Sequence, residues 1–118
     1  RWLRVCARSG CATAAARSPR ALAASAIARG ELDAAFAHLE RAHILSQRFA
    51  FAHAWTHLRM LTVGWRRRDA REIVGQVFRS VAALTKSKLW VPLGNTGGAN
   101  VNPFQPMPAP PDLRPYLD

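Results

Sequence analysis

Apolar residues recur at helical spacing in four stretches of the chain, which short polar or glycine-containing segments separate. Apolar side chains three or four residues apart line one face of an α-helix. Gly30 ends the first stretch as a helix C-cap would, and Asp69 is placed to cap the fourth. The spacing therefore predicts four helices, over residues 20–29, 31–46, 50–66 and about 70–85.

Each stretch has one apolar face, which a small domain would turn toward its core. In the second stretch, His43 shares this face with Leu32, Ala35, Phe36, Leu39 and Ala42, so it is expected to point inward. In the third, His53 and His57 lie beside a stripe formed by Phe51, Trp55, Leu58 and Trp65. In the fourth, the apolar positions include Ile73, Val77, Val81 and Leu84.

The helices group into two helix–turn–helix units, with RGELDAA near the first turn and RRDAREI near the second. Such hairpins resemble those of tetratricopeptide repeats. The two turns are about 38 residues apart, however, whereas the repeat has a period of 34 and its own aromatic and proline positions. The resemblance concerns topology. We predict an all-α fold, a small four-helix arrangement of two antiparallel, TPR-like hairpins.

The two ends of the chain differ in composition from the helical part, which we place at residues 17–88. Residues 1–16 contain several arginines and alanines and no acid, and we expect them to form a basic, poorly ordered N-terminal extension. Residues 89–118 hold seven of the eight prolines and have no helical period. Because this segment also carries large apolar residues, we expect it to pack on the helices as an irregular Pro/Gly-rich wrap.

The chain has a net charge of +10, from 17 Lys and Arg against 7 Asp and Glu. Such an excess is typical of proteins that contact nucleic acids or anionic surfaces. The run from Arg66 to Arg71, with Lys86 and Lys88, could contact phosphates, but no nucleic-acid-binding motif accompanies it. Residues 1–30 supply much of the excess, with six arginines and no acid. We therefore rank nucleic acid below a metal ion or a protein as the partner.

Several other classes have little support in the sequence. Cys6 and Cys11 lack the two-residue spacing of zinc knuckles and thioredoxin-like sites. Ser46 and Ser80 lack the context of a nucleophilic serine, so no catalytic residue is assigned. No uncharged apolar run reaches the ~18 residues of a membrane span. We expect no membrane span and a cytoplasmic location.

Four metal-binding side chains lie almost symmetrically about a turn near Arg48, with Glu40 and His43 before it and His53 and His57 after it. In an antiparallel hairpin His43 and His53 would be level. Glu40 and His57 would form the next pair, with a mismatch of one residue, or about 1.5 Å. Because spacings of three and four residues keep each pair on one helix face, all four side chains could reach one ion.

Three histidines and one glutamate would suit Zn²⁺ best, and also Ni²⁺, Co²⁺ or Fe²⁺. A closed set of four ligands is typical of structural sites or metal handling. If Glu40 instead only supports the ligands, three histidines and a water would form an open, hydrolytic type of site. The alternative without metal is a structural polar cluster, and acid–base catalysis ranks below both.

A second candidate site is the segment GNTGGAN, with Gly94, Asn95, Thr96, Gly97, Gly98 and Asn100 as its possible ligand-binding residues. Glycines allow the backbone conformations of an anion-binding nest. The segment lacks the Lys-Ser/Thr ending of a P-loop, however. The competing interpretation is a tight turn that packs on the helices, with the asparagines satisfying nearby backbone groups.

The strings HLERAHILSQ, GNTGGANV and PMP resemble an uncharacterised bacterial family, described only as a domain of unknown function, over residues from about 18 to 115. The matching positions are Glu40, Arg41, His43, His53, His57 and the glycine loop. Residues 1–16 depart from the family. The resemblance implies no activity, but it implies that the histidines and the loop form one functional unit.

The sequence therefore predicts a small helical protein that binds a divalent transition metal ion for sensing, buffering or delivery. The alternative is a module that binds protein or nucleic acid, in which the histidines are structural. A second alternative is a small metal-dependent enzyme, which we rank below the binding functions.

Overall fold

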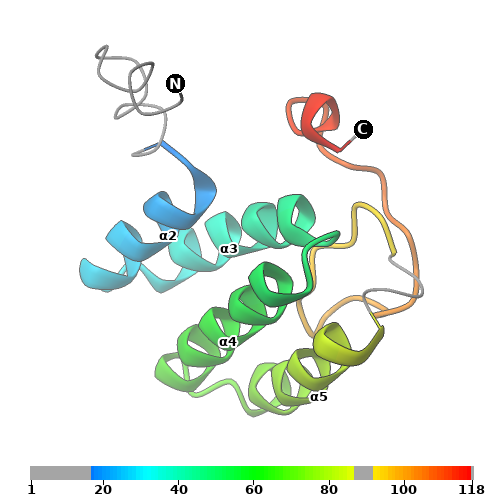
Figure 1. The fold of residues 1–118 in the computed structure, drawn as a ribbon. Helices are drawn as coiled ribbons and strands as arrows, with labels where there is room; N and C mark the ends of the chain where they lie inside the picture. Colours follow the sequence, from blue (N-terminus) through cyan, green and yellow to red (C-terminus); the bar gives the residue numbers. More distant parts are fainter. Residues whose placement is uncertain (1–16, 87–91, 118) are drawn as a thin grey trace.

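Figure 1 shows a computed structural model of the protein, which describes residues 17–86 and 92–117. Its elements are α2 (Pro19–Ala28), α3 (Leu32–Ser46), α4 (Ala50–Arg66), α5 (Ala70–Lys86) and, in the C-terminal segment, the 3-10 turn η2 (Arg114–Tyr116). None of the described residues forms a β-strand. The predicted all-α class is confirmed.

The helix ends follow from local sequence signals. Ser18 caps α2, because its Oγ accepts a hydrogen bond from the Ala21 N–H at 3.3 Å. Gly30 follows this helix with a φ of 74°, as a C-terminal glycine does. Asp69 caps α5 by accepting a hydrogen bond from the Glu72 N–H at 3.0 Å. The predicted helices agree with the observed bounds to within one residue at each end.

Each helix packs mainly on its neighbours in sequence, which joins the four into two connected hairpins (Figure 1). The main apolar core lies between α2, α3 and α4, and it consists of Ala23, Ala26, Ala35, Phe36, Leu39, Met60 and Val63. The connection from α3 to α4 is short, with the Phe49 N–H donating to the Ser46 carbonyl at 2.8 Å. This connection sets the C-terminal half of α3 against the first turns of α4.

The apolar stripes of α4 and α5 do not face the core as expected. Phe51 and Trp65 on α4 are 86% and 70% exposed, and Val81 on α5 is 62% exposed. The inward face of α5 instead carries Glu72 and Gln76, both buried. These two side chains find hydrogen-bond partners inside the molecule. The prediction was wrong because polar contacts, which hydrophobic periodicity cannot reveal, set the rotation of α5.

The C-terminal segment lies against the helices rather than extending away from them. The Gln47 side chain, just after α3, donates to the Pro92 carbonyl at 3.0 Å. Arg79 of α5 donates from Nη2 to the Val101 carbonyl at 2.7 Å. Further along, Leu113 is buried, with 4% of its surface exposed. These contacts anchor the segment to both hairpins.

Some predictions fall on parts of the chain that are not described. The poorly ordered extension expected at residues 1–16, which contains both cysteines, lies outside the described residues, and so does Lys88. Among the described helices, none has the length and apolar character needed to cross a membrane.

Candidate metal centre

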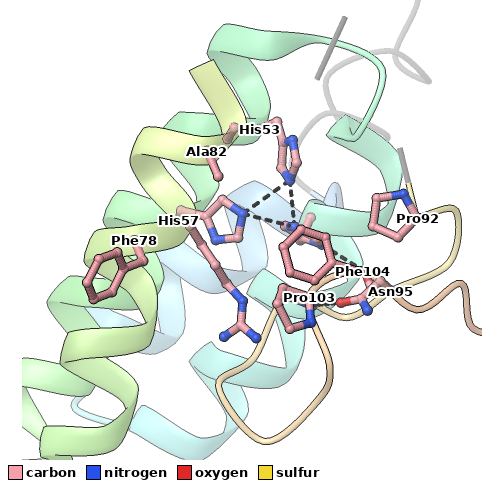
Figure 2. A pocket seen from close by; sticks show the side chains of 12 residues that line it. His53, His57, Phe78, Ala82, Pro92, Asn95, Pro103 and Phe104 are labelled. Atoms are coloured by element: carbon pink, nitrogen blue, oxygen red, sulfur yellow. Dashed lines mark hydrogen bonds between the residues drawn. The ribbon is translucent and has the colours of Figure 1, made fainter. Parts of the chain in front are cut away.

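Three histidine rings meet in the interior, one from α3 and two from α4 (Figure 2). The Nε2 atom of His43 lies 2.7 Å from Nε2 of His53 and 3.2 Å from Nε2 of His57, and the last two are 3.1 Å apart. No ring is more than 8% exposed. Among the described residues, these three form the group of side chains close enough to hold one metal ion. The turn brings His43 and His53 together, as predicted.

The hydrogen-bond partner of His43 fixes which ring nitrogen carries its proton. Its Nδ1 lies 2.8 Å from the backbone carbonyl oxygen of Asn95. Because a carbonyl oxygen only accepts hydrogen bonds, Nδ1 is the donor, and the neutral ring leaves a lone pair on Nε2. Asn95 is itself held firmly, since it is 1% exposed and its Nδ2 donates to the carbonyls of Asn102 and Gln105. Asn95 therefore aims the lone pair of His43 at the other two rings.

A second chain of hydrogen bonds fixes the proton of His57. Its Nδ1 lies 2.6 Å from Oε1 of Gln76. The amide nitrogen of Gln76 donates to Oε1 of Glu72 at 2.5 Å and to the Gly97 carbonyl at 2.8 Å, which assigns the oxygen to the histidine side. Nδ1 of His57 is therefore a donor, and its Nε2 also presents a lone pair. These hydrogen bonds, from Glu72 through Gln76 to His57, are of the kind that orients metal-binding histidines.

Where the three rings meet, hydrogen-bond acceptors outnumber donors. The lone pairs of His43 and His57 face each other at 3.2 Å, and two acceptors cannot form a hydrogen bond. His53, with Nε2 near both, could donate one proton to only one of them at a time. A cation at this point would instead accept all three lone pairs.

The spacing of the three nitrogens fits a metal ion. Nitrogens at about 2.0–2.1 Å from one ion lie about 3.3 Å apart in a tetrahedral site and about 2.9 Å apart in an octahedral one. The observed separations of 2.7, 3.1 and 3.2 Å lie within about 0.3 Å of the octahedral value, and the shortest would have to lengthen by about 0.6 Å to reach the tetrahedral one. In both geometries three protein ligands leave at least one position open.

Burial keeps the three rings in the neutral form that metal binding requires. Desolvation lowers the pKa of His53 to about 4. The pKa of His57 falls to about 3, again mainly through desolvation. Desolvation, with smaller effects from the other two rings, lowers the pKa of His43 well below its usual value. At neutral pH a divalent ion would therefore bind without first displacing a proton from these rings.

Glu40, the fourth expected ligand, lies outside the group formed by the three histidines. Its side chain is half-buried, and its pKa is raised by desolvation and by the nearby carboxylate of Glu72. It faces the glycine loop, since a Cβ added at Gly98 would lie 3.4 Å from its Oε1. His53 and His57 both reach His43 directly, so the meeting point is level with His43 and not with Glu40.

The loop of residues 94–100 packs directly on the cluster. Gly97 has a φ of 81°, and a Cβ at this position would approach the His43 ring to 2.7 Å. The N–H groups of Gly94, Gly97 and Ala99 donate to side-chain oxygens of the protein. Of the remaining loop residues expected to contact a ligand, Gly98 is buried, Thr96 half-buried and Asn100 exposed. The loop and the histidines thus lie together in space, and the loop positions His43.

A cavity of about 170 Å³ adjoins the three rings. Figure 2 shows Phe78 and Ala82 of α5 on one side of it and Pro92, Pro103 and Phe104 of the C-terminal segment on the other. Its lining also includes Arg79. The histidine cluster is therefore not sealed on all sides by packed side chains.

Sequence reasoning missed Gln76, Glu72 and Arg79. All three lie on α5, whose inward face was assigned to its apolar residues. A polar strip at spacings of three and four residues was visible in the sequence. The sequence offered no means of deciding which of the two strips faces the histidines.

No curated protein and no solved structure is significantly similar to the chain. A family model described as "Protein of unknown function (DUF3703)" matches residues 12–117. The match bears out the resemblance to an uncharacterised family and extends it, because it begins inside the segment 1–16 that was expected to depart from the family. The chain therefore belongs to the DUF3703 family of proteins of unknown function.

Proposed function

We propose that the protein binds one divalent transition metal ion through the Nε2 atoms of His43, His53 and His57. The observation that carries this proposal is the convergence of three buried, neutral imidazoles within 3.2 Å of one another. Two of them hold their protons on Nδ1 and so have no proton to share at the centre. Burial of such facing acceptors costs free energy that a bound cation would recover.

Zn²⁺ is the proposed ion, with Ni²⁺, Co²⁺ and Fe²⁺ as the alternatives that imidazole ligands also suit. Without Glu40 the protein supplies three neutral ligands, which favours an open site over a closed structural one. An open site exchanges its ion more readily than a closed one, in keeping with metal sensing, buffering or delivery as the use.

The test is elemental analysis of protein purified without a His-tag and without chelators. Wild type should contain close to one equivalent of transition metal, or take it up from added Zn²⁺, Ni²⁺, Co²⁺ or Fe²⁺. The double variant His53→Ala/His57→Ala should lose it while circular dichroism shows retained helices. His38→Ala is the matched control, because His38 does not belong to the cluster.

Wild type that fails to bind any of these ions would refute the proposal. The alternative function, a module that binds another macromolecule, would then be the better account. Its candidate surface is the exposed stripe of α5 formed by Val74, Val77, Val81 and Leu84, whose spacing is that of a helix-pairing seam.

A further inference from the structure

The cavity beside the histidines has the size and lining of a binding site for a small organic molecule. Its volume of about 170 Å³ is close to that of an engineered apolar cavity of about 150 Å³ that holds benzene. Phe78, Ala82 and Ala83 of α5 and Pro103 of the C-terminal segment contribute to its wall. The lining contributed by these residues is apolar, as in most small-molecule sites.

The charge at this cavity favours an anion. Three neutral imidazoles would leave the full double charge of a bound ion uncompensated. Arg79 adds a further positive charge, close enough to His43 and His57 to contribute to their lowered pKa values. The nearest carboxylate on α5, that of Glu72, already accepts hydrogen bonds from Gln76 and from the Ala99 N–H.

Arg79 also has hydrogen-bonding capacity left over. Its Nη2 donates to the Val101 carbonyl, which holds the side chain beside the cavity. Within the described part of the chain, its Nε is the buried side-chain nitrogen or oxygen that lacks a hydrogen-bond partner. Because this Nε has almost no accessible surface, a ligand in the cavity would contact the other guanidinium nitrogens, whose fork geometry a carboxylate matches.

We infer that the cavity binds a small carboxylic acid of roughly four carbons, three of which form its apolar body. Its carboxylate would lie between the open coordination positions of the ion and Arg79, and its hydrocarbon part would pack on the α5 wall. This inference rests on the proposed metal site, and it names the class of ligand that the same site takes up. Isobutyrate has the required size and charge and serves as the probe.

The experiment titrates the Co²⁺-loaded protein with isobutyrate, because the visible absorption of Co²⁺ reports changes in its coordination. The change in the spectrum should reach saturation as isobutyrate is added. Isobutyrate should bind more tightly than acetate, whose apolar part is a single methyl group. Isobutanol, which lacks the charge, should have no effect. Arg79→Gln should weaken isobutyrate binding about tenfold or more while the Co²⁺ content stays at one equivalent.

Two further variants keep the test decisive. Arg71→Gln, an exposed position on the same helix, should leave isobutyrate binding unchanged. Ala82→Leu narrows the cavity without touching a charge, and it should weaken isobutyrate more than acetate. If Arg79→Gln does not fold, the effect of Ala82→Leu decides the question.

The possible failures are distinguishable. If the protein binds one equivalent of Co²⁺ but its spectrum does not respond to isobutyrate, the inference is overturned and the metal site stands. The same conclusion follows if acetate and isobutyrate bind equally tightly to both wild type and Ala82→Leu. An isobutyrate affinity unaffected by Arg79→Gln in a folded variant would also overturn the inference, because the inference places the carboxylate against Arg79. Failure of Co²⁺ itself to bind would overturn both proposals.

Discussion

The Nε2 atoms of His43 and His57 face each other at 3.2 Å, although each ring already uses its Nδ1 proton on an oxygen acceptor. The two acceptors come from different parts of the fold, the backbone of Asn95 in the C-terminal segment and the Gln76 side chain on α5. Each acceptor therefore orients its own histidine ring, and the Nε2 lone pairs of the two rings point at the same place. Such an arrangement is typical of outer partners that orient metal ligands.

Gln76→Leu should lower the affinity for Zn²⁺ by about 10- to 100-fold, the usual effect of losing an outer hydrogen bond to a metal-binding histidine. The physical reason is that Nδ1 of His57 loses the acceptor that orients its ring. A competition titration with a chromophoric chelator measures the change. Gln105→Leu, at an exposed position of the C-terminal segment, is the control. Equal affinities for the two variants would show that Gln76 does not orient the ligand.

Gly97→Ala should both destabilise the fold and weaken metal binding, because the new Cβ would meet the His43 ring at 2.7 Å. Gly30→Ala is the matched control, since Gly30 also has a positive φ, of 74°, but an added Cβ there meets nothing within 4 Å. The control should lose only about 1–2 kcal/mol of folding free energy from backbone strain. Gly97→Ala should lose more, as urea denaturation of both variants would measure. Equal losses would argue against the close packing of the loop on His43.

The stability of the metal-free protein should fall as the pH is lowered from about 6.5 toward 4. The pKa values of His53 and His57 are about 4 and 3 in the folded protein, and about 6.5 in the unfolded chain. As the pH falls, the histidines of the unfolded chain bind protons at a higher pH than the buried rings do. Proton binding therefore favours unfolding below about pH 6.5, and this effect is absent well above that pH. At pH 5 the loss should be of the order of 2 kcal/mol for each of these two rings.

Urea denaturation at pH 7, 6 and 5 checks this dependence. The raised pKa of Glu40 acts in the opposite direction, because acidification relieves the cost of its buried charge. The variant His53→Ala/His57→Ala should accordingly show a shallower loss than wild type. A wild type whose stability is flat over this range would contradict the burial of neutral histidines.

The affinity for Zn²⁺ should change little between pH 7.5 and 5.5. Three exposed histidines with ordinary pKa values would lose about three orders of magnitude in affinity at pH 5.5, through protonation of the rings. The buried rings remain neutral over this range, so the change should be less than about tenfold. Isothermal titration in two buffers of different ionisation enthalpy would also report the few protons released. Release of two or three protons per ion at pH 5.5 would be inconsistent with the lowered pKa values.

The helices and part of the site could be predicted from the sequence because they depend on local signals. Apolar spacing, together with residues such as Gly30 and Asp69, defined the helix bounds. The symmetry of His43 and His53 about the turn predicted their contact, since helical rise and spacing fix positions along a hairpin. Residues close in sequence to one short turn have few arrangements available.

The remaining features depend on contacts between distant segments. Glu40 was grouped with the histidines by register, but its side chain turns toward Gly98 and Glu72, which come from the loop and α5. The inward face of α5 was misjudged for a similar reason. Gln76 is buried because His57 and Gly97 supply its partners. No periodicity within α5 carries that information.

The most direct test of the account is X-ray absorption spectroscopy of the Zn²⁺-loaded protein, which counts and identifies the atoms bound to the ion. The account predicts three imidazole nitrogens at about 2.0–2.1 Å, with the remaining position or positions filled by oxygen. The same spectrum from His53→Ala/His57→Ala should not show this signature. Sulfur at about 2.3 Å, which would assign the ion to cysteine, or fewer than three imidazoles in the wild type would contradict it.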